Sequence, residues 1–158
     1  MNMKIMTITV FCAIDDQDRS GWAADTAIDL ARATSSMLVF FMANPAVLPG
    51  RGPVVYLWTT EYIEKYFAQA KRRARRASVY DIKCITRNAV DVAGAILREA
   101  ENEGADYIVM GSNGRVGLFG FWQNSITRQV AAKTRCPIII VHNELLRRHL
   151  GPDLLAAE

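Results

Sequence analysis

The sequence has few of the residues that enzymes use for nucleophilic or metal chemistry. Only two histidines occur in 158 residues, His142 and His149, and both follow the last apolar segment. The three cysteines, Cys12, Cys84 and Cys136, lack the spacing of a metal site. These shortages argue against a Ser–His–acid or Cys–His catalytic centre and against a bound metal. Catalysis is therefore poorly supported by the composition.

Long apolar runs and a strong charge of one sign are also absent. No stretch approaches the roughly 20 apolar residues that span a bilayer, so we expect no membrane segment. Asp15 and Asp16 interrupt the apolar N-terminal region and no small-residue cleavage site follows, which predicts no signal peptide. An odd number of cysteines in apolar segments fits a reducing compartment, and we expect a cytoplasmic protein. The net charge of +3 is too small to predict nucleic-acid binding.

Apolar segments of strand length alternate along the chain with segments of helical periodicity. The expected strands are 8–14, 37–42, 81–86, 107–110 and 138–141, and the expected helices are 22–33, 58–78, one from the cap Asn88 to Gly104, and 125–133. Prolines and glycines across 44–53 predict a loop. The alternation predicts one three-layer α/β/α domain with a five-stranded parallel sheet. The domain would cover 1–142, and 143–158 would be a C-terminal extension.

A loop that carries glycines follows the fourth expected strand. Residues 111–125 read GSNGRVGLFGFWQNS, and a helix is expected to begin near Ser125. Such a loop presents backbone N–H groups and a helix N-terminus to an anion. Asp15 and Asp16 follow the first strand, and ligands of open parallel sheets bind beyond the carboxyl ends of the strands. If the first and fourth strands are neighbours, both loops face one crevice.

The glycine loop resembles the phosphate-binding motif of the universal stress protein family, Gly-x2-Gly-x9-Gly-(Ser/Thr). Gly111, Gly114 and Ser125 match this motif, and Asn124 stands at the position of its third glycine. Together with similar first and last strands, the resemblance covers nearly the whole chain. It implies a Rossmann-like, adenine nucleotide alpha hydrolase-like fold with strand order 3-2-1-4-5.

The resemblance also implies ATP as the ligand. In ATP-binding members of the family, adenine lies near the ends of the first two strands and the triphosphate lies on the glycine loop. Carried onto this chain, the resemblance implies that adenine or ribose contacts Ala13, Ile14 and Asp15, and that the adenine edge pairs with the backbone of Ala43. Ribose and phosphates would contact Met110, Gly111 and Gly114. Phosphates would also contact Asn124, Ser125 and Ile126, and Arg115 would face anionic oxygens.

The departure at Asn124 keeps alternatives open. Asparagine tolerates positive φ better than most residues, but its side chain can cap a helix and satisfy donors that phosphate would use. Asp15 can instead be a turn residue, Ser125 a helix cap and Arg115 a solvated side chain. Besides an ATP-binding regulatory module, two functions stay open. One is a stress protein that binds no nucleotide and acts by protein contacts. The other is a slow ATP hydrolase with Asp15 or Asp16 as its base.

The last expected strand predicts a homodimer. In the order 3-2-1-4-5 this strand lies at an edge, and the run from Ile138 to Val141 has no charge or proline to protect it. Antiparallel pairing about a two-fold axis would bury the run and close the assembly. The competing interpretation is that 143–158 covers the edge. The basic run 71–76 is interpreted as the solvated face of a helix, with contact to an acidic partner, anionic lipid or nucleic acid as the alternative.

Overall fold

The computed structural model describes residues 7–47, 50–112 and 126–142 of the chain. Strands and helices alternate along the described sequence as expected, except that two strands, β2 and β3, follow one another. The elements in chain order are β1 (Thr9–Ala13), α1 (Asp18–Thr34), β2 (Met37–Val47), β3 (Val55–Tyr56), α2 (Thr60–Arg76), β4 (Ile82–Ala89), α3 (Val92–Asn102), β5 (Tyr107–Ser112), α4 (Ile126–Lys133) and β6 (Ile138–His142).

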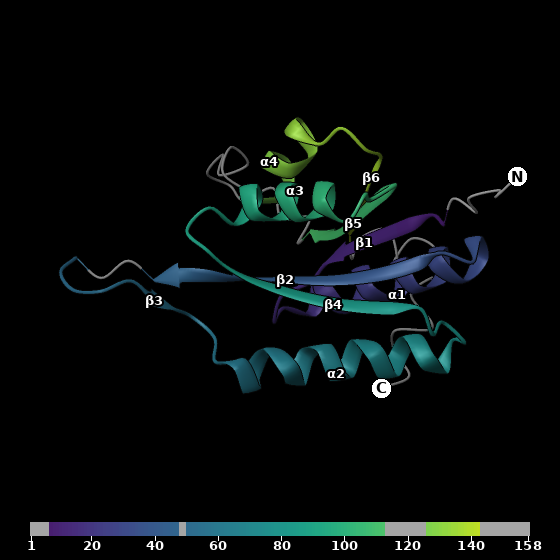
Figure 1. Cartoon of the computed structure of the whole chain (residues 1–158), viewed down its shortest axis with the longest axis horizontal. Coiled ribbons are helices and arrows are strands. Elements are labelled where there is room, and N and C mark those ends of the chain that lie inside the picture. The colour runs from purple at the N-terminus through teal and green to yellow at the C-terminus, as the bar shows by residue number, and fades with distance from the viewer. Residues whose placement is uncertain (1–6, 48–49, 113–125, 143–158) are drawn as a thin grey trace, which may run out of the picture.

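Five of the strands form a parallel sheet in the order β4-β2-β1-β5-β6 (Figure 1). Counted among these five strands alone, this is the expected order 3-2-1-4-5. The sixth strand, β3, was not expected. It pairs antiparallel with the end of β2 and makes the sheet mixed. The chain winds outward from β1 in both directions, so the strand order reverses between β1 and β5, where ligands of such sheets bind.

Helices cover both faces of the sheet. α1 and α2 pack on one face, and α3 and α4 pack on the other (Figure 1). Side chains alternate between these two layers along each central strand. Val10, Cys12 and Leu38 belong to the core under α1 and α2, whereas Phe11 and Val39 belong to the core under α3 and α4. This burial on both faces explains why the central strands are continuous apolar runs.

β2 continues through residues that the sequence predicted as a loop. It includes Asn44 and Pro45 and ends at Val47, and it forms a hairpin with β3 that projects from the sheet (Figure 1). The Pro45 C=O accepts the Leu57 N–H at 2.9 Å, so proline takes part in the hairpin through the one backbone hydrogen-bonding group that it has. The loop prediction for 44–53 was therefore wrong over its first residues.

Two helix starts also differ from the sequence expectation. α1 begins at Asp18 rather than at Trp22. α3 is capped by Asp91, whose carboxylate accepts the Gly94 N–H at 2.9 Å, and not by Asn88. Asn88 stays in β4 because the pairing of this strand with β2 continues beyond it. None of the helices in the described ranges has the length and apolar character to cross a lipid bilayer.

Candidate functional site

A cavity of about 260 Å³ opens at the carboxyl ends of β1, β2 and β5. The β1–α1 turn and the end of β2 form one side, and α3, β5 and the start of α4 form the other. The cavity therefore lies where the strand order reverses. Its lining residues are Ala13, Ile14, Asp15, Asp16, Gln17, Ser20, Phe41, Ala43, Pro45, Trp58, Val92, Ile96, Met110, Gly111, Ile126 and Thr127.

The structure brings together seven of the residues that the sequence assigned to a ligand. Ala13, Ile14, Asp15, Ala43, Met110, Gly111 and Ile126 line this one cavity. The other four, Gly114, Arg115, Asn124 and Ser125, lie outside the described residues. The hydroxyl of Thr127 donates to the Gly111 C=O at 3.3 Å and ties the start of α4 to the end of β5.

The backbone of Ala43 points to the side of β2 on which β1 has ended. In a parallel strand the N–H and C=O of one residue point to the same side, and this side alternates along the strand. The Phe41 C=O accepts the Ile14 N–H at 2.8 Å, so Phe41 faces β1. Ala43 faces the same way, but β1 ends at Ala13. A planar group with one donor and one acceptor fits this position.

Asp15 and Ser20 hold the β1–α1 turn in place. The Ser20 hydroxyl accepts the Asp15 N–H at 2.7 Å and donates to the Asp15 carboxylate. The same carboxylate accepts the Gln17 N–H at 3.0 Å. Asp15 thus has a structural role in the turn and also lines the cavity, so the two interpretations of this residue are compatible.

Trp58 lines the cavity but was not among the residues predicted from the sequence. Its backbone is fixed by Asn44, whose side chain accepts the Trp58 N–H at 2.9 Å and donates to the Trp58 C=O at 2.8 Å. Its indole stacks on Tyr62, with ring centroids 6.3 Å apart and planes 22° apart. No local sequence pattern signals this role, because it depends on a contact between two segments of the hairpin.

Tyr62 links this aromatic group to the β1–α1 turn. Its hydroxyl donates to the Asp16 carboxylate at 3.3 Å. The Tyr66 ring lies 5.2 Å from the Tyr62 ring, and the hydrogen bond between the two hydroxyls raises the pKa of Tyr62 to about 12. Tyr62 therefore remains a neutral donor at physiological pH.

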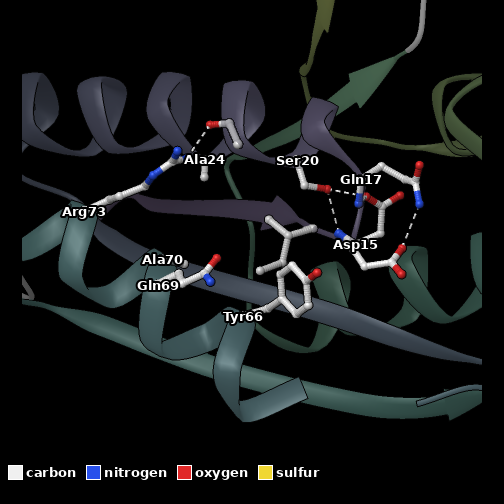
Figure 2. Close-up of a pocket in the computed structure, with 11 residues that line it drawn as sticks. Asp15, Gln17, Ser20, Ala24, Tyr66, Gln69, Ala70 and Arg73 are labelled. Carbon is white, nitrogen blue, oxygen red and sulfur yellow. Dashed lines mark hydrogen bonds between the residues drawn. The ribbon is translucent and has the colours of Figure 1, made fainter. Parts of the chain in front are cut away.

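A second cavity, of about 300 Å³, lies between α1 and α2 on the other face of the sheet (Figure 2). Figure 2 shows Arg73 at one end and Asp15 at the other, with Tyr66 between them. Arg73 donates to the Gly21 C=O at 3.1 Å and pairs with Asp25 at 3.5 Å. The two cavities share the β1–α1 turn through Ile14, Asp15, Asp16, Gln17 and Ser20.

The cysteines offer little nucleophilic chemistry. Burial raises the pKa of the Cys12 thiol, and burial also raises the pKa of Cys84. A raised pKa disfavours the thiolate, which is the nucleophile and the metal ligand. Within residues 7–47, 50–112 and 126–142, no three His, Cys, Asp or Glu side chains are grouped so that they could hold a metal ion.

The family model described as "Universal stress protein family" matches residues 6–142. The chain belongs to the universal stress protein family. The resemblance noted in its glycine loop and its terminal strands is thereby confirmed, and so is the α/β fold that this resemblance implied.

Individual relatives agree with this assignment. Universal stress protein YxiE of Bacillus subtilis (strain 168) is 28% identical over an alignment of 142 residues that covers 82% of this chain and 95% of that protein. A universal stress protein crystallised in complex with cAMP is 26% identical with a TM-score of 0.70, over 86% of this chain and 97% of that one. The Archaeoglobus fulgidus universal stress protein in complex with dAMP has a TM-score of 0.63 at 18% identity, over 86% and 98% of the two chains. At that identity, the last comparison shows the fold alone.

Proposed function

We propose that this universal stress protein is a regulatory module that binds an adenine nucleotide, with ATP as the ligand that the sequence favours. The observation that carries the proposal is the cavity at the switch point, where seven of the residues implied by the family resemblance meet. The 26% identical relative in complex with cAMP supports an adenine nucleotide as the ligand class.

The walls of the cavity suit the parts of such a ligand. The N–H and C=O of Ala43 would pair with the adenine edge, and Ala13 and Met110 would flank the nucleoside. Small-molecule sites start at roughly 300 Å³, so a cavity of about 260 Å³ suits a nucleoside better than a whole nucleotide. The phosphates would extend past Gly111 toward the residues that the family motif assigns to them.

Asn124 favours a second candidate, a stress protein that binds no nucleotide and acts through protein contacts. The side chain at this position could cap the following helix and occupy space near the phosphates. A slow ATP hydrolase is supported less well, because the Asp15 carboxylate already accepts from Ser20 and Gln17. An aspartate committed to a turn is a poor general base.

Mass spectrometry of small molecules released from the purified protein, with calorimetry of ATP, AMP and cAMP, tests the proposal. We expect a released adenine nucleotide, or saturable binding of at least one of the three. If nothing is released and none of the three binds at physiological concentrations, the proposal is refuted and the second candidate is favoured. Turnover of bound ATP that Asp15→Ala abolishes would instead establish the hydrolase.

The proposal includes a homodimer through β6. This strand pairs with β5 on one side, and no strand of the described residues pairs with its other side. Its five residues, Ile138–His142, are only half-buried in one chain. At the opposite edge β4 carries the exposed charges of Lys83 and Arg87, which protect an edge from pairing.

Sedimentation of the wild type and of Ile139→Lys tests the dimer. We expect a wild-type dimer and a monomeric variant, because a lysine in a buried strand pair would lose its hydration. A monomeric wild type at micromolar concentration would refute the dimer, and so would a variant that stays fully dimeric.

A further inference from the structure

Trp58 lines the cavity at the carboxyl ends of β1, β2 and β5, and its side chain also packs against the core under α1 and α2. It lies between β3 and α2, and its side chain is half-buried. Phe41, Ile96 and Met110 line the same cavity. A flat ring bound there would meet aromatic and apolar surface, which is the surface that nucleobases prefer in protein sites.

The Trp58 backbone is fixed by Asn44, which follows Ala43, the residue proposed to hydrogen-bond to adenine. Asn44 is 4% exposed, and both polar groups of its side chain are used on the Trp58 backbone. Ala43 precedes it, with its N–H and C=O directed to the side where β1 has ended. One short segment of β2 therefore places a hydrogen-bonding edge and an aromatic ring at the same cavity.

The ring itself is also held. Tyr62 stacks against the indole, and Tyr62 is in turn held by its contacts with Tyr66 and Asp16. Asp16 belongs to the β1–α1 turn that lines the cavity. A ring backed by a second ring loses little freedom when it binds a ligand, so more of the contact energy appears as affinity.

We infer that the Trp58 indole stacks on the base of the bound nucleotide. The inference rests on the proposed function, since it assigns a contact within the same site. Stacking on an aromatic side chain favours any base, because every base has a π face. Trp58 would therefore supply affinity, and the Ala43 backbone would supply the choice of adenine.

Two substitutions at Trp58 separate stacking from simple packing. Trp58→Leu removes the ring and keeps an apolar side chain, whereas Trp58→Phe keeps an aromatic face. The control is Trp22→Leu, because Trp22 is a half-buried α1 residue that does not line the cavity. The probe is whichever of ATP, AMP and cAMP binds the wild type most tightly by calorimetry.

We expect Trp58→Leu to weaken that nucleotide about tenfold or more. Trp58→Phe and Trp22→Leu should bind close to the wild-type value. Unchanged affinity in Trp58→Leu would overturn the inference. Equal losses in Trp58→Leu and Trp58→Phe would also overturn it, since packing of the hairpin would then explain the effect. A wild type that binds none of the three nucleotides would refute the proposed function itself, and the inference with it.

A fluorescence measurement covers the case in which Trp58→Leu does not fold. The chain has three tryptophans, so Trp22→Phe combined with Trp122→Phe leaves Trp58 as the only indole. Its emission should change on nucleotide addition and saturate at the concentration found by calorimetry. Calorimetric binding without any change in this emission would show that the base does not contact the ring.

Discussion

The two cavities that share the β1–α1 turn are similar in size but differ in their polar groups. Their volumes are about 260 and 300 Å³, and both include the β1–α1 turn. In the cavity between α1 and α2, Arg73 contacts the Gly21 C=O and Asp25. Asp16, at the other end, accepts from Gln17 and from Tyr62. The switch-point cavity shares Asp16 and the rest of this turn, but it lacks Arg73 and adds Ala43, whose backbone lies at the end of a strand.

This difference shows why cavity volume alone does not identify a binding site. Charged side chains that already form hydrogen bonds or ion pairs with protein groups, as Arg73 does, do not require a ligand as a further partner. Backbone groups at a strand end, as at Ala43, have lost the neighbouring strand that would have paired with them. Buried polar groups favour a hydrogen-bond partner, so a ligand gains most where the sheet itself stops supplying one. The strand end is therefore the better site, although its cavity is slightly smaller.

Filling each cavity in turn tests most directly whether the nucleotide binds in the switch-point cavity and not in the cavity between α1 and α2. Ala13 lies on the α3–α4 side of β1 and lines the switch-point cavity, whereas Ala70 lines the α1–α2 cavity. We expect Ala13→Leu to weaken nucleotide binding about 100-fold, or about 3 kcal/mol, because the leucine occupies the space of the base. Ala70→Leu should bind close to the wild-type value. Calorimetry on both variants measures this.

Thermal unfolding of the two alanine variants provides the control for this pair. Overpacking a core position costs about 1–3 kcal/mol, so both melting temperatures should fall by comparable amounts. If Ala70→Leu stays folded and yet loses nucleotide binding, the two cavities act as one site. The conclusion that the nucleotide binds in the switch-point cavity alone would then be wrong.

The sequence predicted the central sheet better than its connections. Strands such as β1 and β5 are buried runs whose pattern is local, and the family motif supplied their order. The β2–β3 hairpin was missed because it depends on contacts between distant residues. The Asn44 side chain binds the backbone of Trp58, which lies 14 positions further along the chain. The residues close to Pro45 in the sequence therefore do not indicate this contact.

In the candidate site too, some residues could be predicted from the sequence and others depend on contacts between distant segments. Residues at strand ends, such as Ala13 and Met110, could be named from the sequence because the family resemblance extends over the strands that carry them. Trp58 could not, since its place follows from the hairpin. The basic run of α2 was interpreted as solvated, and Arg72, Arg75 and Arg76 are indeed exposed. Arg73 differs, because it reaches α1 across 52 positions of the chain.

Removing the Arg73 contact tests whether a change in the α1–α2 cavity affects stability without affecting nucleotide affinity. Arg73→Gln would lose the hydrogen bond to Gly21 and the pair with Asp25, in which the two side chains are 48% and 60% exposed. At such exposure we expect a loss below about 1 kcal/mol in the free energy of unfolding. Nucleotide affinity should not change, because the contact lies outside the switch-point cavity. Urea denaturation and calorimetry measure the two quantities, and a change in affinity would contradict the separation of the cavities.

The smallest expected effect comes from the neighbouring arginines of the same helix. Arg72 and Arg75 are exposed, and in the part of the chain that the structure describes neither side chain makes a hydrogen bond or an ion pair. Arg72→Gln combined with Arg75→Gln should therefore change the free energy of unfolding by less than about 0.5 kcal/mol. The double variant carries one charge change more than Arg73→Gln, so it corrects for any general effect of lowering the positive charge of α2. If it loses as much stability as Arg73→Gln in the same urea titration, the loss belongs to charge alone. The contact between Arg73 and Gly21 would then contribute nothing to holding the α1–α2 cavity in shape.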